Sequence, residues 1–250
     1  MRRNLVVILI IVLLTGVYPA SGNRARAQEI AKNYPFETAL ELSRILDRQF
    51  IFSFVKKGCP HCQEYKGKIL SDPDVKGFLN KHFILSLVPV GKTFEIELPE
   101  RGKVTNIQLA SGLGAKGTPT TYVFYPPDPG LLQEGRGITR FEGPPPDPSS
   151  MVDLLERLAA ESFKKSDKES STDSSYYNYT PSVKQITKKD FNLLKEVEIG
   201  IPIVSEKVAL SSLPQAPELI VNISSSDSSK EYSKKIVSET DVKKVFLVES

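Results

Sequence analysis

The sequence is short of the residues that would build several common kinds of site. Tryptophan is absent, and the 250 residues include only two cysteines, two histidines and two methionines. A structural zinc site needs four soft ligands, and the only histidine outside the Cys59–Cys62 stretch is His82, so we expect no zinc site. The net charge is only +3, and no dense run of lysine and arginine carries interleaved aromatic residues. We therefore expect no nucleic-acid partner.

A hydrophobic run long enough to cross a bilayer comfortably is also missing near the N-terminus. The uncharged apolar run Leu5–Val17 is shorter than the roughly 20 residues of a membrane-spanning helix. It follows Arg2 and Arg3 and precedes the Ala25–Ala27 tripeptide, which is an A-x-A-like cleavage site. This pattern predicts a signal peptide over residues 1–27 and a periplasmic or otherwise exported protein, in a compartment where disulfides persist. An uncleaved membrane anchor is the alternative.

The two cysteines stand where a predicted strand gives way to a predicted helix. Phe50–Val55 is aromatic and β-branched without a breaker, which predicts a buried strand. Cys62, Tyr65 and Ile69 then recur at helical spacing. Pro60 suits the first helical turn, because its missing N–H would have no partner there. A Cys-x-x-Cys that opens a helix after a strand favours redox chemistry over a static disulfide or half of a metal site.

The chain from residue 30 to residue 162 alternates predicted helices and strands, which indicates an α/β domain. Helices are predicted over Pro35–Arg48, Val75–Lys81 and Ile107–Leu113, and from Ser150 onward, with Ser150 and Asp153 as a capping pair. Further strands are predicted over Phe83–Val88, Thr120–Tyr125 and Gly137–Phe141. The segment Pro89–Gly102 carries proline, glycine and charges, which predicts a loop or an edge ribbon.

A second motif, Gly117-Thr118-Pro119-Thr120, stands directly before one of these strands. Proline cannot donate a hydrogen bond in the middle of a ladder. Pro119 fits this place if it occupies the first position of the strand in a fixed turn, for which a cis peptide bond is one solution.

This order of elements, with Cys59-Pro60-His61-Cys62 and Gly117-Thr118-Pro119-Thr120, resembles the thioredoxin fold. The Cys59–Cys62 motif is similar to the active site of that superfamily, and the Gly117–Thr120 motif is similar to the loop whose cis-proline lies against that site. The spacing is most similar to periplasmic thioredoxin-like proteins associated with sulfur oxidation, and the Pro-His pair is found in DsbA-type oxidants. The resemblance implies a central mixed sheet flanked by helices and the activity of a thiol-disulfide oxidoreductase in cell redox homeostasis.

The site residues then take the following expected roles. Cys59 is the nucleophile, since unpaired N–H groups at a helix N-terminus stabilise a thiolate, and Cys62 resolves the mixed disulfide. His61 adds positive charge or a hydrogen bond. The resemblance implies that Thr118 and Pro119 present backbone to the substrate. We expect no cofactor beyond the redox-active disulfide. The expected partners are thiol- or disulfide-bearing proteins and a membrane or periplasmic redox partner.

The chain departs from the family pattern at Ser53. Thioredoxins and DsbA-type oxidants have a buried carboxylate at this position, six residues before the first cysteine. The proton acceptor for Cys62 is then water or another group, with Glu64 near in sequence. Lys56 and Lys57 make the approach to the cysteines electropositive. The direction of exchange stays open, because one dipeptide cannot fix a reduction potential that differs by about 150 mV between thioredoxin and DsbA.

Residues 163–185, rich in serine, lysine, aspartate and tyrosine, are predicted to be a linker, and residues 186–250 a second α/β segment. Aliphatic strands return at Ile201–Val204, Leu219–Ile223 and Val245–Val248. The stretch Gln63–Lys76 aligns without a gap with Lys230–Lys243, in a register that places Ser226 and Ser229 where Cys59 and Cys62 stand. We predict a partial, cysteine-less thioredoxin-like repeat that serves in binding or dimerisation. Coincidence between two lysine-rich amphipathic helices is the alternative.

Two other classes of function compete with an oxidoreductase. Cys59, His61 and Cys62 could bind Cu(I), which soft thiolates select, although no methionine-rich stretch supports this alternative. The chain could instead be a non-enzymatic interaction module on a thioredoxin fold, with a static disulfide.

Overall fold

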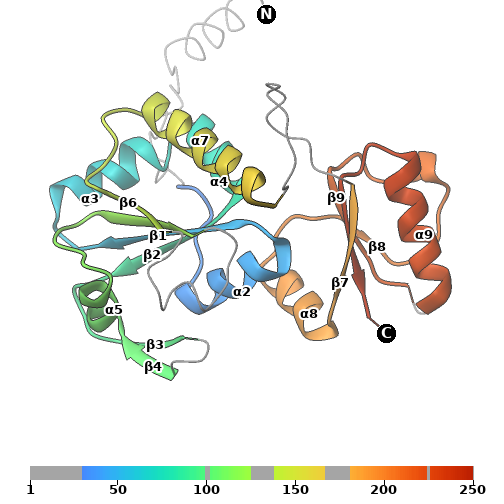
Figure 1. Cartoon of the computed structure of the whole chain (residues 1–250), viewed down its shortest axis with the longest axis horizontal. Helices are drawn as coiled ribbons and strands as arrows, with labels where there is room; N and C mark the ends of the chain where they lie inside the picture. The colour runs from blue at the N-terminus through green and yellow to red at the C-terminus, as the bar shows by residue number, and fades with distance from the viewer. Residues whose placement is uncertain (1–29, 99–101, 125–137, 167–180, 224–225, 250) are drawn as a thin grey trace, which may run out of the picture.

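A computed structural model describes residues 30–98, 102–124, 138–166, 181–223 and 226–249. The predicted signal peptide lies outside these residues. Two units follow each other along the chain, residues 30–166 and residues 181–249, and each has its own four-stranded sheet (Figure 1). In the described part of the chain, no helix combines the length and the apolar character needed to cross a membrane.

The sheet of the first unit has the strand order β2-β1-β5-β6. Its strands are β1 (Gln49–Val55), β2 (Phe83–Pro89), β5 (Thr120–Phe124) and β6 (Ile138–Glu142). β1 and β2 are parallel, β5 is antiparallel to β1, and β6 is antiparallel to β5. A parallel bridge between Asn33 and Leu85 extends the sheet beyond β2. A parallel crossover joined to an antiparallel hairpin in this order is the thioredoxin fold, as predicted.

Helices cover both faces of this sheet. They are α2 (Phe36–Leu46), α3 (Pro60–Glu64), the π-helical turn η1 (Tyr65–Ile69) that continues α3, α4 (Pro73–His82), α5 (Asn106–Gly112) and α7 (Pro148–Ser166). α2 packs on one face, and α4 and α7 pack on the other. β1 is therefore buried along its whole length, which explains why its sequence is a continuous apolar run instead of an alternating one.

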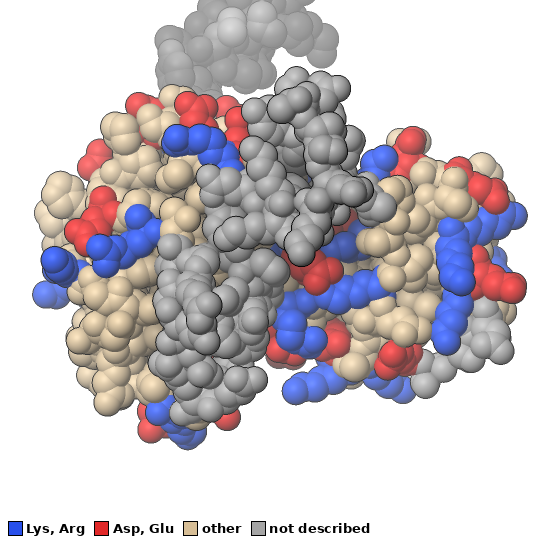
Figure 2. All heavy atoms as spheres, viewed as in Figure 1, with Lys and Arg blue, Asp and Glu red and all other residues tan. Residues whose placement is uncertain are grey.

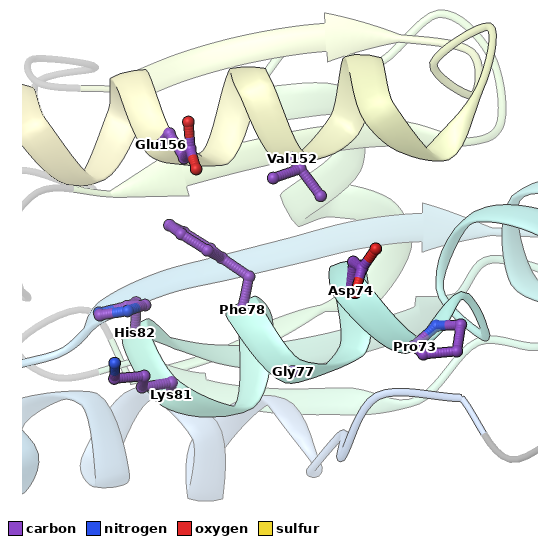
Figure 3. Close-up of a pocket in the computed structure, with 8 residues that line it drawn as sticks. All are labelled: Pro73, Asp74, Gly77, Phe78, Lys81, His82, Val152 and Glu156. Atoms are coloured by element: carbon purple, nitrogen blue, oxygen red, sulfur yellow. The ribbon is translucent and has the colours of Figure 1, made fainter.

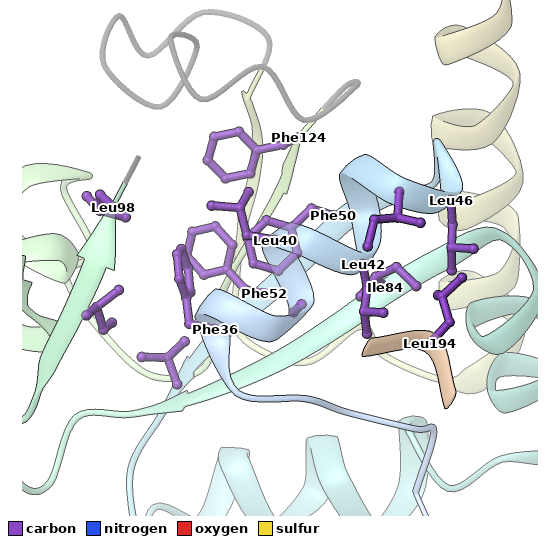
Figure 4. Packing of buried hydrophobic residues seen from close by; sticks show 14 of the residues in the cluster. Phe36, Leu40, Leu42, Leu46, Phe50, Phe52, Ile84, Leu98, Phe124 and Leu194 are labelled. Carbon is purple, nitrogen blue, oxygen red and sulfur yellow. The ribbon is translucent and has the colours of Figure 1, made fainter. Parts of the chain in front are cut away.

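Aromatic rings form the centre of the core between α2 and the sheet (Figure 4). Phe36 of α2 makes edge contacts with Phe50 and Phe52 of β1, each at a centroid distance of 5.1 Å. Phe52 also stacks on Tyr122 and Phe124 of β5, at 5.3 and 5.4 Å. These contacts hold β1 in the middle of the sheet and so fix the starting point of the cysteine motif that follows it.

The structure corrects the predicted start of the last helix of the first unit. α7 begins at Pro148, and Asp147 caps it in place of the predicted pair Ser150 and Asp153. Asp147 Oδ1 accepts hydrogen bonds from the Ser150 N–H (2.8 Å) and from the Ser149 hydroxyl (2.6 Å). Proline suits the first helical position because it has no N–H to leave unpaired. The cap of the helix therefore lies three residues before the predicted one.

The segment predicted as a loop or edge ribbon contains a small antiparallel hairpin. It is formed by β3 (Glu95–Leu98) and β4 (Gly102–Thr105) and leads directly into α5. Asn106, the first residue of α5, is fully buried and donates to the carbonyls of Pro89 (2.6 Å) and Lys92 (2.9 Å). This side chain holds the loop after β2 against the start of α5.

The second unit is an all-parallel sheet in the order β7-β10-β9-β8. Its elements are β7 (Ser182–Ile186), α8 (Lys188–Glu196), β8 (Ile203–Val204), the 3-10 turn η2 (Leu210–Ser212), β9 (Glu218–Val221), α9 (Ser226–Glu239) and β10 (Lys244–Val248). The predicted linker ended at residue 185, but β7 already starts at Ser182. Its pairing with β10 is a long-range contact that the polar composition of Ser182–Gln185 does not reveal.

The predicted internal repeat has a structural counterpart. β9, α9 and β10 form a parallel crossover, as do β1, its following helices and β2. Tyr65 aligns with Tyr232 and Ile69 with Ile236, and all four side chains are buried. The two copies differ after the first helix, because the second copy enters β10 directly where the first copy has α4. The second unit also has the parallel strand β8 where the first has the antiparallel strand β5, which makes it a partial repeat.

The two units meet at the C-terminal end of α2. Lys184 Nζ donates to the carbonyl of Arg44 (2.7 Å) and Lys244 Nζ to that of Leu46 (3.2 Å). Both lysines also pair with the Asp47 carboxylate. Cations near the last carbonyls of a helix interact favourably with its dipole. Two side chains of the second unit thus complete the end of a helix in the first.

A nearly buried ion pair and a shared apolar cluster lie beside these lysines. Arg48 and Glu218 are 2.5 Å apart, and their side chains are only 10% and 16% exposed. The apolar cluster around α2 continues into Ile186, Leu194 and Phe246 of the second unit. Figure 2 shows acidic and basic side chains side by side along this border. The second unit is therefore docked through a defined interface.

Candidate active site

The loop between β1 and α3 presents the first cysteine of the motif. β1 ends at Val55, and the Cys59 N–H donates to the Lys56 carbonyl (3.4 Å) to close a tight turn. Gly58 in this turn has a φ of +78°, a conformation that residues with a Cβ rarely adopt. The turn carries the chain from the end of the strand into α3, and Pro60 is the first residue of that helix.

Cys59 is the N-cap residue of α3. Its Sγ accepts a hydrogen bond from the Cys62 N–H at 3.2 Å and lies 3.3 Å from the Thr118 carbonyl oxygen. Cys59 is partly exposed, whereas Cys62 is only 2% exposed and accepts a hydrogen bond from the Lys56 N–H at 3.5 Å. Both thiols are free in the structure. One sulfur is thus accessible and the other lies one turn inward.

The two thiols have opposite pKa shifts. The hydrogen bond from the Cys62 thiol lowers the pKa of Cys59, and the backbone N–H groups of Cys62 and His61 add to this effect. Burial raises the pKa of Cys62, and its hydrogen bond with Cys59 raises it further. A thiolate therefore forms first on the accessible sulfur, and the inner sulfur holds the shared proton.

The second predicted motif lies against the first. The Thr118–Pro119 peptide bond is cis, and Pro119 is buried. The loop is fixed by bonds from the Gly143 N–H to the Pro119 carbonyl (2.8 Å) and from the Thr120 hydroxyl to the Gly117 carbonyl (2.7 Å). This arrangement aims the Thr118 carbonyl at the Cys59 sulfur.

Pro60 and His61, the two residues between the cysteines, are both exposed. His61 stabilises the Cys59 thiolate through its backbone N–H. Figure 1 shows the start of α3 at the edge of the first unit, away from the second unit. The middle of the motif therefore faces solvent, where a substrate can approach.

The Ser53 side chain lies in a buried network of three hydroxyl groups. Ser53 is fully buried, and its Oγ lies 2.8 Å from Thr121 Oγ1 and 3.3 Å from the Tyr65 hydroxyl. Burial raises the pKa of Tyr65, so this group stays neutral. Glu64 is about half exposed and pairs with Lys68 on the helix surface at 3.6 Å. It therefore does not take the place of a buried carboxylate.

Sequence reasoning missed Tyr65 and Thr121 as members of this network and Asn106 as the anchor of the loop after β2. By its helical spacing Tyr65 is an ordinary core residue. Asn106 gave one usable signal, since asparagine next to a predicted helix start often makes a local side-chain bond.

The described residues contain no group of three or more His, Cys, Asp and Glu side chains that could hold a metal ion. A groove of about 370 Å³ lies elsewhere, between α4 and α7, and is lined by Asp74, Phe78, His82 and Glu156 among others (Figure 3). It is formed by helices on the face of the sheet opposite α2 and contains neither cysteine.

No protein-family model matches the sequence, and no curated protein matches it. Among solved structures, a thioredoxin from Thermus thermophilus is similar over 56% of this chain and 95% of its own, with 21% identity and a TM-score of 0.41. DsbH oxidoreductase is similar over 52% of this chain and 85% of its own, with 18% identity and a TM-score of 0.40. A thioredoxin-fold protein from Helicobacter pylori is similar over 65% of this chain and 92% of its own, with 17% identity and a TM-score of 0.38. The fold assignment rests on the strand topology of this chain.

Proposed function

We propose that the protein is an exported thiol-disulfide oxidoreductase that works through the Cys59–Cys62 pair. The observation that carries the proposal is the position of the Cys59 sulfur. It accepts the Cys62 N–H at a helix N-terminus and lies 3.3 Å from the Thr118 carbonyl, beside the cis-proline loop. The lowered pKa of Cys59 and the raised pKa of Cys62 suit an attacking and a resolving thiol.

The exchange takes place in two steps. The Cys59 thiolate attacks one sulfur of a substrate disulfide, and a mixed disulfide forms as the other substrate sulfur leaves as a thiolate. Cys62 then loses its proton and attacks the Cys59 sulfur, which releases the second substrate thiolate. Two electrons pass from the dithiol to the substrate, and Cys59 and Cys62 end as a disulfide. The same steps in reverse oxidise a substrate dithiol.

A trapping experiment tests this role. The Cys62→Ser variant cannot resolve the mixed disulfide, so it should accumulate a covalent complex with a disulfide-bearing protein such as insulin, one that dithiothreitol releases. Cys59→Ser is the matched control, since it keeps one cysteine but lacks the accessible thiol. The absence of a complex with Cys62→Ser, or equal complexes with both variants, would contradict the proposal.

The reduction potential of the pair decides the direction. A value near about −120 mV would make the protein an oxidant, and one near about −270 mV a reductant that a membrane or periplasmic redox partner must recharge. A pair that never equilibrates with thiol-disulfide buffers would leave the interaction module as the better description. Tight Cu(I) binding to the reduced protein would favour the metal-handling alternative.

The proposed export and the role of residues 186–250 need separate measurements. Export predicts that the mature protein begins after residue 27 and is recovered from the periplasm. Binding or dimerisation through the second unit predicts a mass above that of one chain in sedimentation, or capture of a partner that a chain lacking this unit loses.

A further inference from the structure

Three segments far apart in the sequence are joined to one another by hydrogen bonds beside the cysteine loop. The Val90 N–H donates to the Val55 carbonyl (2.9 Å), which joins the loop after β2 to the start of the cysteine loop. Asn106 ties that loop to α5, and the chain after α5 reaches Thr118, whose carbonyl contacts Cys59. Residues 55–63, 88–94 and 106–120 thus form one surface, which we call the thiol surface.

The three segments of the thiol surface contain lysines but no acidic residue. None of the 30 acidic residues of the chain lies in its three segments, whereas Lys56, Lys57, Lys92 and Lys116 do, and all four are exposed. Among the described residues, none of these four lysines takes part in an ion pair of 4.0 Å or less. Their charge is available to a binding partner.

The acidic residues that directly follow two of these segments are already paired with other cations. Glu64 pairs with Lys68 at 3.6 Å, and Glu95 pairs with Lys103 at 3.0 Å. These carboxylates therefore do little to offset the positive field that the thiol surface projects.

An exposed apolar contact lies within the same surface. Phe94 and Ile107 are 38% and 42% exposed and are two of the three large hydrophobic side chains exposed in the described residues. The Asn106 N–H donates to the Phe94 carbonyl (3.0 Å), and the Phe94 N–H donates to Asn106 Oδ1 (3.1 Å). These two bonds keep Phe94 next to the start of α5, where Ile107 lies.

We propose that the thiol surface selects protein substrates whose reactive cysteine is flanked by acidic residues with a bulky apolar residue nearby. This inference rests on the proposed function, because it names the substrate class of the same site. The lysines attract the acidic flank and orient it over Cys59, and Phe94 and Ile107 receive the apolar side chain. The exchange reaction itself is the one given above.

Three disulfide-linked model peptides test the selection. They share one apolar residue and one cysteine but carry acidic, uncharged or basic flanks. At low salt we expect kcat/KM for reduction by the dithiol protein to be about five- to tenfold higher for the acidic than for the uncharged peptide, and lowest for the basic one. The preference should shrink in about 0.5 M salt, because the lysines are exposed and screened.

A charge-reversed variant and a matched control locate the effect. Lys56→Glu/Lys57→Glu should abolish or invert the acidic-to-uncharged ratio. Lys234→Glu/Lys235→Glu changes the net charge equally at an exposed lysine pair of α9 and should keep the ratio. Because the same thiol attacks both peptides, the ratio is independent of any change in the reactivity of Cys59.

The outcomes separate this inference from the proposed function. Bis(2-hydroxyethyl) disulfide is small and uncharged, and it reports exchange without flank recognition. If it reacts but the wild-type protein does not prefer the acidic peptide, or both double variants lose the preference equally, the substrate class is wrong. If it does not react with Cys59 at all, the oxidoreductase function itself is wrong.

Discussion

The difference between the two cysteine thiols is the residue-scale feature on which the chemistry depends. The Cys62 thiol is the main cause of the lowered pKa of Cys59. We therefore expect the rate of alkylation of Cys59 by iodoacetamide to rise with pH around a midpoint below that of an ordinary thiol. For Cys62 the midpoint of the same pH dependence should lie above that of an ordinary thiol. Cys62→Ala should move the Cys59 midpoint upward. Mass-spectrometric alkylation rates against pH measure both, and an unchanged Cys59 midpoint in the variant would refute this origin.

His82 is a second titratable group with a defined consequence. It is 8% exposed, and its ring contacts the Phe78 ring at a centroid distance of 4.7 Å with the planes tilted by 43°. Burial together with Lys81 and Arg48 lowers the pKa of His82 to about 4. Between about pH 6.5 and pH 4 the unfolded chain binds the proton and the native chain does not. The free energy of unfolding should therefore fall by about 2 kcal/mol as the pH drops through this window.

Urea unfolding at several pH values measures this dependence. The expected stability is fully present above about pH 6.5 and lost toward about pH 4, because the neutral imidazole is the buried form. His82→Gln removes the titration and should flatten the slope in this window. An equally steep slope in that variant would assign the acid sensitivity to other groups.

The sequence predicted the cysteine motif and the Pro119 turn because each is a contiguous pattern with its own local chemistry. It also marked Ser53 as a departure. It could not predict the partners of Ser53, because Ser53 bonds Tyr65 across 12 positions and Thr121 across 68. Hydroxyl groups are common in cores and strands, and only the folded sheet brings these three together.

At the scale of elements, the start of α4 offers a direct test of helix capping. Asp72 Oδ1 accepts the N–H groups of Asp74 (3.0 Å) and Val75 (3.2 Å), and Pro73 occupies the first helical positions. Asp72→Ala should lower the free energy of unfolding by about 1 kcal/mol. Asp74→Ala removes an exposed carboxylate from the first turn and should lower the free energy of unfolding by only about 0.3 kcal/mol. Equal losses in urea titrations would argue against capping by Asp72.

Most elements were predictable from periodicity, and the errors have physical reasons. The pattern at Ser150 and Asp153 resembles a capping pair, but Pro148 allows the helix to start earlier, on Asp147. β7 was assigned to a linker because Ser182–Gln185 is polar, and only pairing with β10 makes it a strand. Local composition does not report a pairing strand that lies far along the chain.

At the scale of the whole molecule, the Arg48–Glu218 pair should carry much of the coupling between the two units. Both side chains are largely buried, and Arg48 also donates to the Asn80 carbonyl at 3.1 Å. Arg48→Met leaves the Glu218 carboxylate without its partner and should cost about 2–4 kcal/mol of unfolding free energy. Adding Glu218→Leu should recover part of this loss, because no unpaired charge then remains.

Arg44→Met is the matched control, in the last turn of α2 and four residues before Arg48. The Arg44 side chain is 49% exposed and pairs with Asp190 at 2.9 Å, so its loss should cost less than about 1 kcal/mol. Chemical unfolding of the full chain measures all variants, with fluorescence and circular dichroism followed together. Equal costs for Arg48→Met and Arg44→Met would show that burial of the pair does not matter.

The docking interface and the thiol surface lie at opposite ends of β1. The strand begins at Gln49, directly after the interface residue Arg48, and ends at Val55, where the cysteine loop starts. Docking of the second unit therefore leaves Cys59 accessible. The repeat relation between the units was visible in the sequence, whereas the interface was not, since it pairs α2 with lysines from β7 and β10.

The lysines that cap α2 also bear on the order of events during synthesis. Lys244 bonds the Leu46 carbonyl across 198 positions of the chain. A ribosome that adds roughly 5–20 residues per second needs about 10–40 seconds to cover that distance. Through this interval the Leu46 carbonyl lacks its lysine partner, because Lys244 has not yet been translated. The arrival of β10 is thus the event that completes the end of a helix made much earlier in translation.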